Sequence, residues 1–120
     1  MSSPSVNART ISTHLGDIKI KVIGDDEHVN KTLCVMIPGA KTDVADEWIP
    51  TAMTLAATKK YTCVIIDFHS NTKTIPGILM GGVKTEDISL IINKSILDDT
   101  FQKPKAVIMG KSWGGFQVSA

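Results

Sequence analysis

The chain has 120 residues, of which 42% are hydrophobic and 21% are charged, and its formal net charge is +1. This balance is typical of one globular domain, and a chain of this length buries roughly two-thirds of its unfolded surface. The near-neutral charge gives no electrostatic attraction to nucleic acid, and no apolar run approaches the length of a membrane span. The first ten residues lack the apolar centre of a secretory signal, so we expect a cytoplasmic protein.

Cysteine and histidine residues show no metal-binding pattern. Cys34 and Cys63 each lie inside an apolar run, so we expect two buried free thiols rather than a disulfide. His14, His28 and His69 are far apart and have no carboxylate or thiol partners at the intervals of a zinc site. The sequence therefore predicts neither a metal site nor a cofactor.

Residues 1–8 are rich in Ser, Pro and Asn, and we interpret them as a flexible tail before a single domain at 9–120. Two strands are expected first, at 9–13 and 17–23, joined by a turn around Gly16. Apolar and basic residues alternate in the second strand, which indicates one buried and one exposed face. The alternating residues are Ile18, Lys19, Ile20, Lys21 and Val22.

Two continuous apolar runs follow, at 33–37 and 62–66. Such runs are typical of parallel strands that are buried on both faces. Between them we expect a helix at 46–60, capped by Asp46, because Pro50 is compatible only with the first turn of a helix. The expected apolar face of this helix consists of Trp48, Ile49, Met53, Ala56 and Ala57.

A second helix is expected at 85–97, followed by a last apolar strand at 106–109. Strands that alternate with helices predict an α/β fold with a doubly wound, mostly parallel sheet, preceded here by the antiparallel hairpin. Ligands of such sheets bind beyond the carboxyl ends of the strands, where the loops at 38–43, 68–82 and 110–114 are expected to meet. The apolar stripe of the second helix consists of Ile88, Ile91, Ile92 and Ile96.

The last strand leads directly into a Gly-x-Ser-x-Gly motif, in which Gly110 and Gly114 flank Ser112. After an apolar strand this motif is typical of a nucleophile elbow, a strained strand-to-helix turn that exposes the serine hydroxyl. The glycines avoid collisions with the incoming strand and the outgoing helix, whose first N–H groups can bind an oxyanion. A plain glycine-flanked turn is the alternative. A phosphate-binding loop is rejected because Lys105 occupies its first glycine position.

With these motifs, residues 9–120 resemble the amino-terminal half of the α/β-hydrolase superfamily. The resemblance implies a serine hydrolase of ester, thioester or amide bonds that acts on a small-molecule acyl substrate. It also implies that Ser112 is the nucleophile and that the N–H groups of Ala40 and Trp113 form the oxyanion hole. The motifs that carry the resemblance are Ile37-Pro38-Gly39-Ala40, Trp48-Ile49-Pro50, Ile65-Ile66-Asp67 and Gly110-Lys111-Ser112-Trp113-Gly114-Gly115.

The sequence also departs from the family. Many members have His-Gly where this chain has Pro38-Gly39. Members often carry an Asp-x-x-Gly-x-Gly run after the second buried strand, where this chain has Asp67-Phe68-His69-Ser70-Asn71-Thr72. We interpret Asp67 and His69 as a structural residue and a loop residue rather than as catalytic groups. The family's acid and histidine follow the serine, so we expect both beyond residue 120 and a fold that is incomplete at the carboxyl terminus.

Two further expectations follow from the missing acid and histidine. The last strand would be an uncovered apolar edge, so we expect a second chain or self-association to cover it. The alternative to a hydrolase is a non-catalytic binding or scaffold module with an α/β-hydrolase-like fold.

Overall fold

The computed structural model describes residues 5–24, 32–37, 48–67, 70, 85–101 and 106–110. Within these residues the chain forms five strands, β1 (Val6–Thr13), β2 (Gly16–Ile23), β3 (Thr32–Ile37), β4 (Tyr61–Asp67) and β5 (Val107–Gly110). The helical segments are α2 (Ile49–Ala57) and α3 (Thr85–Leu90), and α3 continues directly into a π-helix, η4 (Ile91–Phe101).

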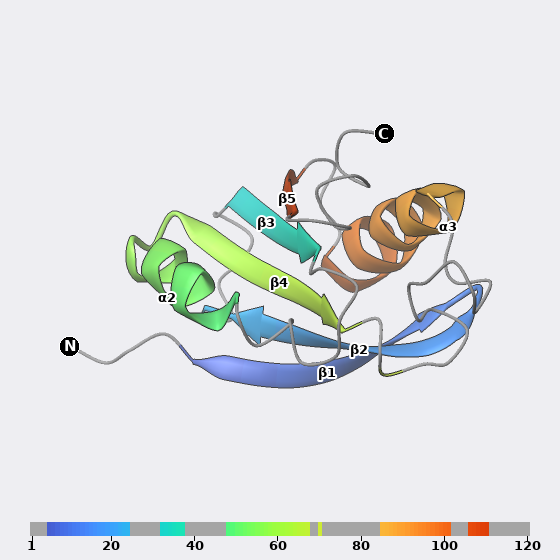
Figure 1. Ribbon diagram of the computed structural model, residues 1–120, viewed down its shortest axis with the longest axis horizontal. Helices are drawn as coiled ribbons and strands as arrows, with labels where there is room; N and C mark the ends of the chain where they lie inside the picture. Colours follow the sequence, from blue (N-terminus) through green and yellow to red (C-terminus); the bar gives the residue numbers. More distant parts are fainter. Residues whose placement is uncertain are drawn as a thin grey trace.

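The five strands form one sheet in the order β1-β2-β4-β3-β5 (Figure 1). Strand β1 pairs with β2 and β2 pairs with β4, both antiparallel, whereas β3 lies between β4 and β5 and is parallel to both. The predicted hairpin and the predicted parallel strands are therefore present. The sheet as described is mixed rather than mostly parallel, because two of its four strand pairings are antiparallel.

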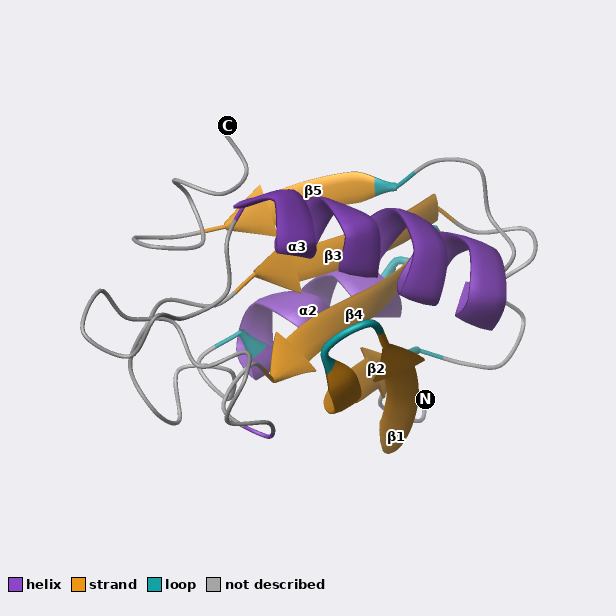
Figure 2. Cartoon of the chain, turned by 90° about the vertical axis from the view of Figure 1, so that its right-hand side faces the viewer, coloured by secondary structure: helices purple, strands orange, loops and turns teal. Residues whose placement is uncertain are grey.

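The helices lie on opposite faces of the sheet, with α2 on one side and α3 with η4 on the other (Figure 2). Alternate residues of β3 belong to two separate core clusters. Leu33, Val35 and Ile37 join the cluster on the α3 side, and Cys34 and Met36 join the cluster on the α2 side. This two-sided burial explains why the run at 33–37 is continuously apolar.

Strand β1 begins at Val6, three residues before the expected start. The hairpin register pairs Val6 with Ile23, so the first strand matches the full length of the second. Residues Val6 to Ala8, which we interpreted as part of the tail, thus belong to the sheet. The error has a simple cause, because only Ile11 of β1 is buried and the exposed positions of an edge strand carry no apolar pattern.

Helix α2 is shorter than the predicted helix at 46–60, and the expected cap Asp46 lies outside the described residues. Pro50 lies in the first turn, as predicted. Ala52 and Ala56 are the buried residues of the helix, whereas Ala57 is exposed. The prediction was wrong at Ala57 because the face turned to the sheet runs through positions 52 and 56, four residues apart.

The second helical region extends beyond its predicted end at Leu97. Its predicted isoleucine stripe is buried against the sheet, and the π-helix η4 continues to Phe101, which is also buried. The Arg9 guanidinium of β1 lies 5.7 Å from the centre of the Phe101 ring, a cation–π contact that joins the hairpin to the end of η4. The stripe consists of Ile88, Ile91, Ile92 and Ile96.

The hydroxyl of Thr62, in β4, is buried and has no hydrogen-bond partner among the described residues. An unpaired buried hydroxyl costs free energy, and valine has the same shape without it. We expect Thr62→Val to raise the free energy of unfolding by about 1 kcal/mol in urea denaturation. The control is Thr54→Val on the exposed side of α2, which should change the same quantity by less than about 0.5 kcal/mol. A loss of stability at Thr62→Val would contradict this interpretation.

Candidate active site

The carboxyl ends of two neighbouring parallel strands define the candidate active site. Strand β3 ends at Ile37 and β5 ends at Gly110, and these two residues are paired in register. Neighbouring strands lie about 4.8 Å apart. Most of the predicted site residues belong to the segments that follow these two strands. Both segments therefore start from neighbouring points at the carboxyl ends of the strands.

The strand order reverses at the carboxyl ends of β3 and β5. From β3 the chain passes through α2 on one face of the sheet to β4, and from β4 it passes through α3 and η4 on the other face to β5. Strand β3 therefore has β4 on one side and β5 on the other. In open α/β sheets a ligand crevice forms beyond the strand ends where the strand order reverses in this way.

The predicted site residues are only partly within the described residues. Gly110 is the last residue of β5 and is half-buried. The described glycines with positive φ are Gly16 and Gly24, so Gly110 does not owe its identity to a left-handed backbone. The remaining site residues, Ser112, Trp113, Gly114 and Ala40, lie outside the described residues.

Ser70, three residues after the end of β4, is held by two hydrogen bonds. The Ser70 hydroxyl donates a hydrogen bond of 2.7 Å to the backbone carbonyl oxygen of Asp67, and it accepts one of 2.8 Å from the backbone N–H of Lys19 in β2. Ser70 thus joins the start of the loop after β4 to the neighbouring strand. Sequence reasoning missed Ser70, since nothing in its surroundings marks it. His69 lies outside the described residues.

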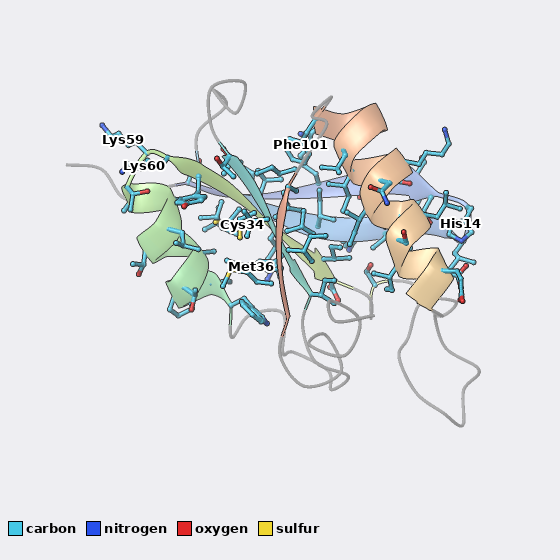
Figure 3. The ribbon with its side chains drawn as sticks, turned by 90° about the horizontal axis from the view of Figure 1, so that it is seen from above. His14, Cys34, Met36, Lys59, Lys60 and Phe101 are labelled. Carbon is cyan, nitrogen blue, oxygen red and sulfur yellow. The ribbon has the colours of Figure 1, made fainter. Side chains whose placement is uncertain are left out.

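His14 has a carboxylate partner that its position in the sequence does not indicate. Its Nε2 lies 2.8 Å from Oδ1 of Asp87, which links the β1–β2 turn to α3 across 73 residues of sequence (Figure 3). A pair of residues 73 apart in the sequence does not have the spacing of a zinc site, so the pair was not predicted. In the sheet β2 is separated from β5 by β4 and β3, roughly 14 Å, so this pair does not join the candidate active site.

The described residues contain no group of three or more His, Cys, Asp or Glu side chains that could hold a metal ion. None of the described helices is long and apolar enough to cross a membrane. Cys34 and Cys63 are free and buried, as predicted.

A scan against protein-family models gave no match, and a search of curated proteins also gave none. Among solved structures, an epoxide hydrolase from an endophytic Streptomyces matches with a TM-score of 0.63 and 15% sequence identity. The fold is α/β-hydrolase-like. At this identity the likeness concerns the fold alone. It covers 95% of this chain and 32% of the epoxide hydrolase, so this chain spans about a third of that protein's length.

Proposed function

We propose that the complete protein is a serine hydrolase that cleaves an ester, thioester or amide bond of a small-molecule acyl substrate. Ser112 is the nucleophile, and the N–H groups of Ala40 and Trp113 bind the oxyanion. A histidine and an acid beyond residue 120 activate the serine. The pairing of Ile37 with Gly110 is the observation that supports this proposal most strongly.

The pairing matters because the connections to the site residues are short. One residue separates Gly110 from Ser112, and two residues separate Ile37 from Ala40. Consecutive Cα atoms are about 3.8 Å apart, so Ser112 lies within about 8 Å of Gly110 and Ala40 within about 11 Å of Ile37. A substrate carbonyl at this edge of the sheet is thus within reach of both segments.

In the proposed reaction the Ser112 hydroxyl attacks the carbonyl carbon while the histidine takes its proton. The carbonyl oxygen becomes an oxyanion that accepts hydrogen bonds from the two amides, each contributing about 2.7–4 kcal/mol to barrier lowering. The histidine then gives the proton to the leaving group, which leaves an acyl group on Ser112. Water, activated by the same histidine, attacks this acyl group and releases the acid.

The proposal includes a doubly wound arrangement for the complete domain, supported by the helices on opposite faces and by the epoxide hydrolase likeness. It also includes a cytoplasmic location, which the free thiols of Cys34 and Cys63 support because such thiols persist in reducing compartments.

Labelling with a fluorophosphonate tests the proposed nucleophile. The complete protein should form one adduct that peptide mapping places on Ser112, and Ser112→Ala should abolish it. Ser89→Ala, a matched change at an exposed serine of α3, should leave labelling unchanged. A folded complete protein without an adduct on Ser112 would overturn the serine hydrolase and favour the non-catalytic binding or scaffold module.

We also propose that the outer edge of β5 is covered in the complete assembly, by further chain or by a second copy. Among the described residues β5 pairs only with β3, and Val107 and Ile108 are 47% and 38% exposed. Unpaired apolar edges promote association, and an edge lysine prevents it. The 120-residue chain should therefore self-associate with rising concentration in sedimentation velocity, and Ile108→Lys should reduce this association.

The matched control for Ile108→Lys is Leu90→Lys, which places the same charge at a 44% exposed apolar residue of α3. This control should leave the association unchanged. A chain that stays monomeric at all concentrations, or an equal effect of the two lysine variants, would contradict a role for the β5 edge.

A further inference from the structure

Sulfur-containing side chains are concentrated on one face of the sheet. The cluster on the α2 side contains both cysteines of the chain, and they lie on adjacent strands in register, Cys34 on β3 opposite Cys63 on β4. Met36 and Met109, a second pair in register, lie on β3 and β5, and Met53 of α2 packs against the same cluster. Figure 3 shows Cys34 and Met36 on the side of the sheet that faces α2.

Two of these sulfur atoms are connected by a hydrogen bond, and a third lies beside them. The Cys34 thiol donates to Sδ of Met109, and the distance between the two sulfur atoms is 3.4 Å. Cys63 lies opposite Cys34 in register on the neighbouring strand, and both thiols are buried.

We propose that Cys34 and Met109 form a binding site for a soft monovalent metal ion such as Cu(I), with Cys63 as a positioning residue. Thiolate and thioether sulfur are the ligands that Cu(I) prefers. The two sulfur atoms belong to adjacent strands and are already in contact, so the backbone does not have to move to bring them together.

Charge balance favours one thiolate in this site. When the ion binds, the Cys34 S–H bond breaks, its proton leaves to solvent, and a metal–sulfur bond forms, while a lone pair of Met109 supplies the second bond. The monovalent ion and one thiolate are together neutral, as an apolar interior requires. Cys63 keeps its proton, because a second thiolate would leave the site negatively charged, and from its place opposite Cys34 its thiol can donate a hydrogen bond to the Cys34 thiolate.

The distance between the two sulfur atoms must increase slightly when an ion binds. Metal–thiolate bonds are of the order of 2.3 Å, as in zinc sites, so a two-coordinate ion would separate the sulfur atoms by about 1 Å more than the observed contact. Met109 can supply this movement, since it is half-buried on the edge strand and methionine has three rotatable side-chain bonds. Cys34 is itself buried, so the ion would enter past the half-buried side chain of Met109.

The test is titration of the chain with Ag(I), a probe that resists redox change, and with Cu(I) under reducing, oxygen-free conditions. We expect one ion to bind per chain and one proton to be released per ion. Cys34→Ala should weaken binding more than 100-fold and Met109→Leu by about 10–100-fold. Cys63→Ala should weaken it about 10-fold, and Cys63→Ser, which keeps a donor, should recover part of that loss.

Met36→Leu is the matched control for Met109→Leu, because Met36 is paired with Met109 in register and lies on the same face. It should leave the affinity unchanged. Leucine conserves the volume of methionine, so this pair stays informative even if Cys34→Ala fails to fold. Equal affinity in the parent and Met109→Leu, an equal loss in both leucine variants, or release of two protons per ion would overturn the proposal.

Discussion

Replacement of Ser112 by alanine in the complete protein should lower kcat for an activated ester about a million-fold, the loss seen for the nucleophile of other serine triads. Without the hydroxyl no acyl group can be transferred to the protein, so the two-step reaction is lost. Substrate binding does not depend on this hydroxyl, so KM should change little. The measurement is steady-state hydrolysis with each variant at matched concentration.

The control for Ser112→Ala is Ser89→Ala, because Ser89 is an exposed serine of α3 that is not part of the Gly-x-Ser-x-Gly motif. This variant should keep the parental kcat. If a folded Ser112→Ala protein retains a tenth or more of the parental kcat, Ser112 is not the nucleophile, whatever reaction the protein catalyses.

Substitution of Ile66 by alanine should lower the free energy of unfolding by about 2–5 kcal/mol. Ile66 is fully buried on β4, which lies between β2 and β3 in the sheet, and its backbone pairs with Ile20. The side chain belongs to the cluster under α3 and η4, so its removal leaves a cavity that rigid neighbours cannot fill. A domain is stable by only about 5–15 kcal/mol, so the loss should be evident in urea denaturation.

Leu90→Ala serves as the control for Ile66→Ala, since Leu90 is a large apolar residue that is 44% exposed on α3. We expect it to change the free energy of unfolding by less than about 0.5 kcal/mol. A loss at Ile66→Ala no larger than that of Leu90→Ala would show that β4 is not the centre of the core.

Much of the fold could be predicted because burial leaves a clear pattern in the sequence. The continuous apolar runs of β3 and β4 reflect two covered faces, and the alternation in β2 reflects one. The start of β1 and the burial of Ala57 were predicted wrongly, because exposed edge positions and alanine carry little pattern. The pairing of β2 with β4 was also outside such reasoning, since local periodicity does not encode which strands are neighbours.

The candidate site was predicted from a local motif, but its position in the sheet was not. The sequence places Ser112 after an apolar strand, and only the strand order shows that this strand adjoins β3 and that Gly110 is paired with Ile37. Contacts between distant residues were missed for the same reason. The link between His14 and Asp87 spans 73 residues, and that between Cys34 and Met109 spans 75.

A crystal structure of the complete protein with a phosphonate bound covalently to Ser112 tests the central claim most directly. The phosphoryl oxygen of such an adduct occupies the place of the oxyanion. We expect it to lie about 2.7–3.1 Å from the amide nitrogens of both Ala40 and Trp113. A structure in which residue 112 lies in a regular strand or helix, away from the segment that follows Ile37, would contradict the proposed active site.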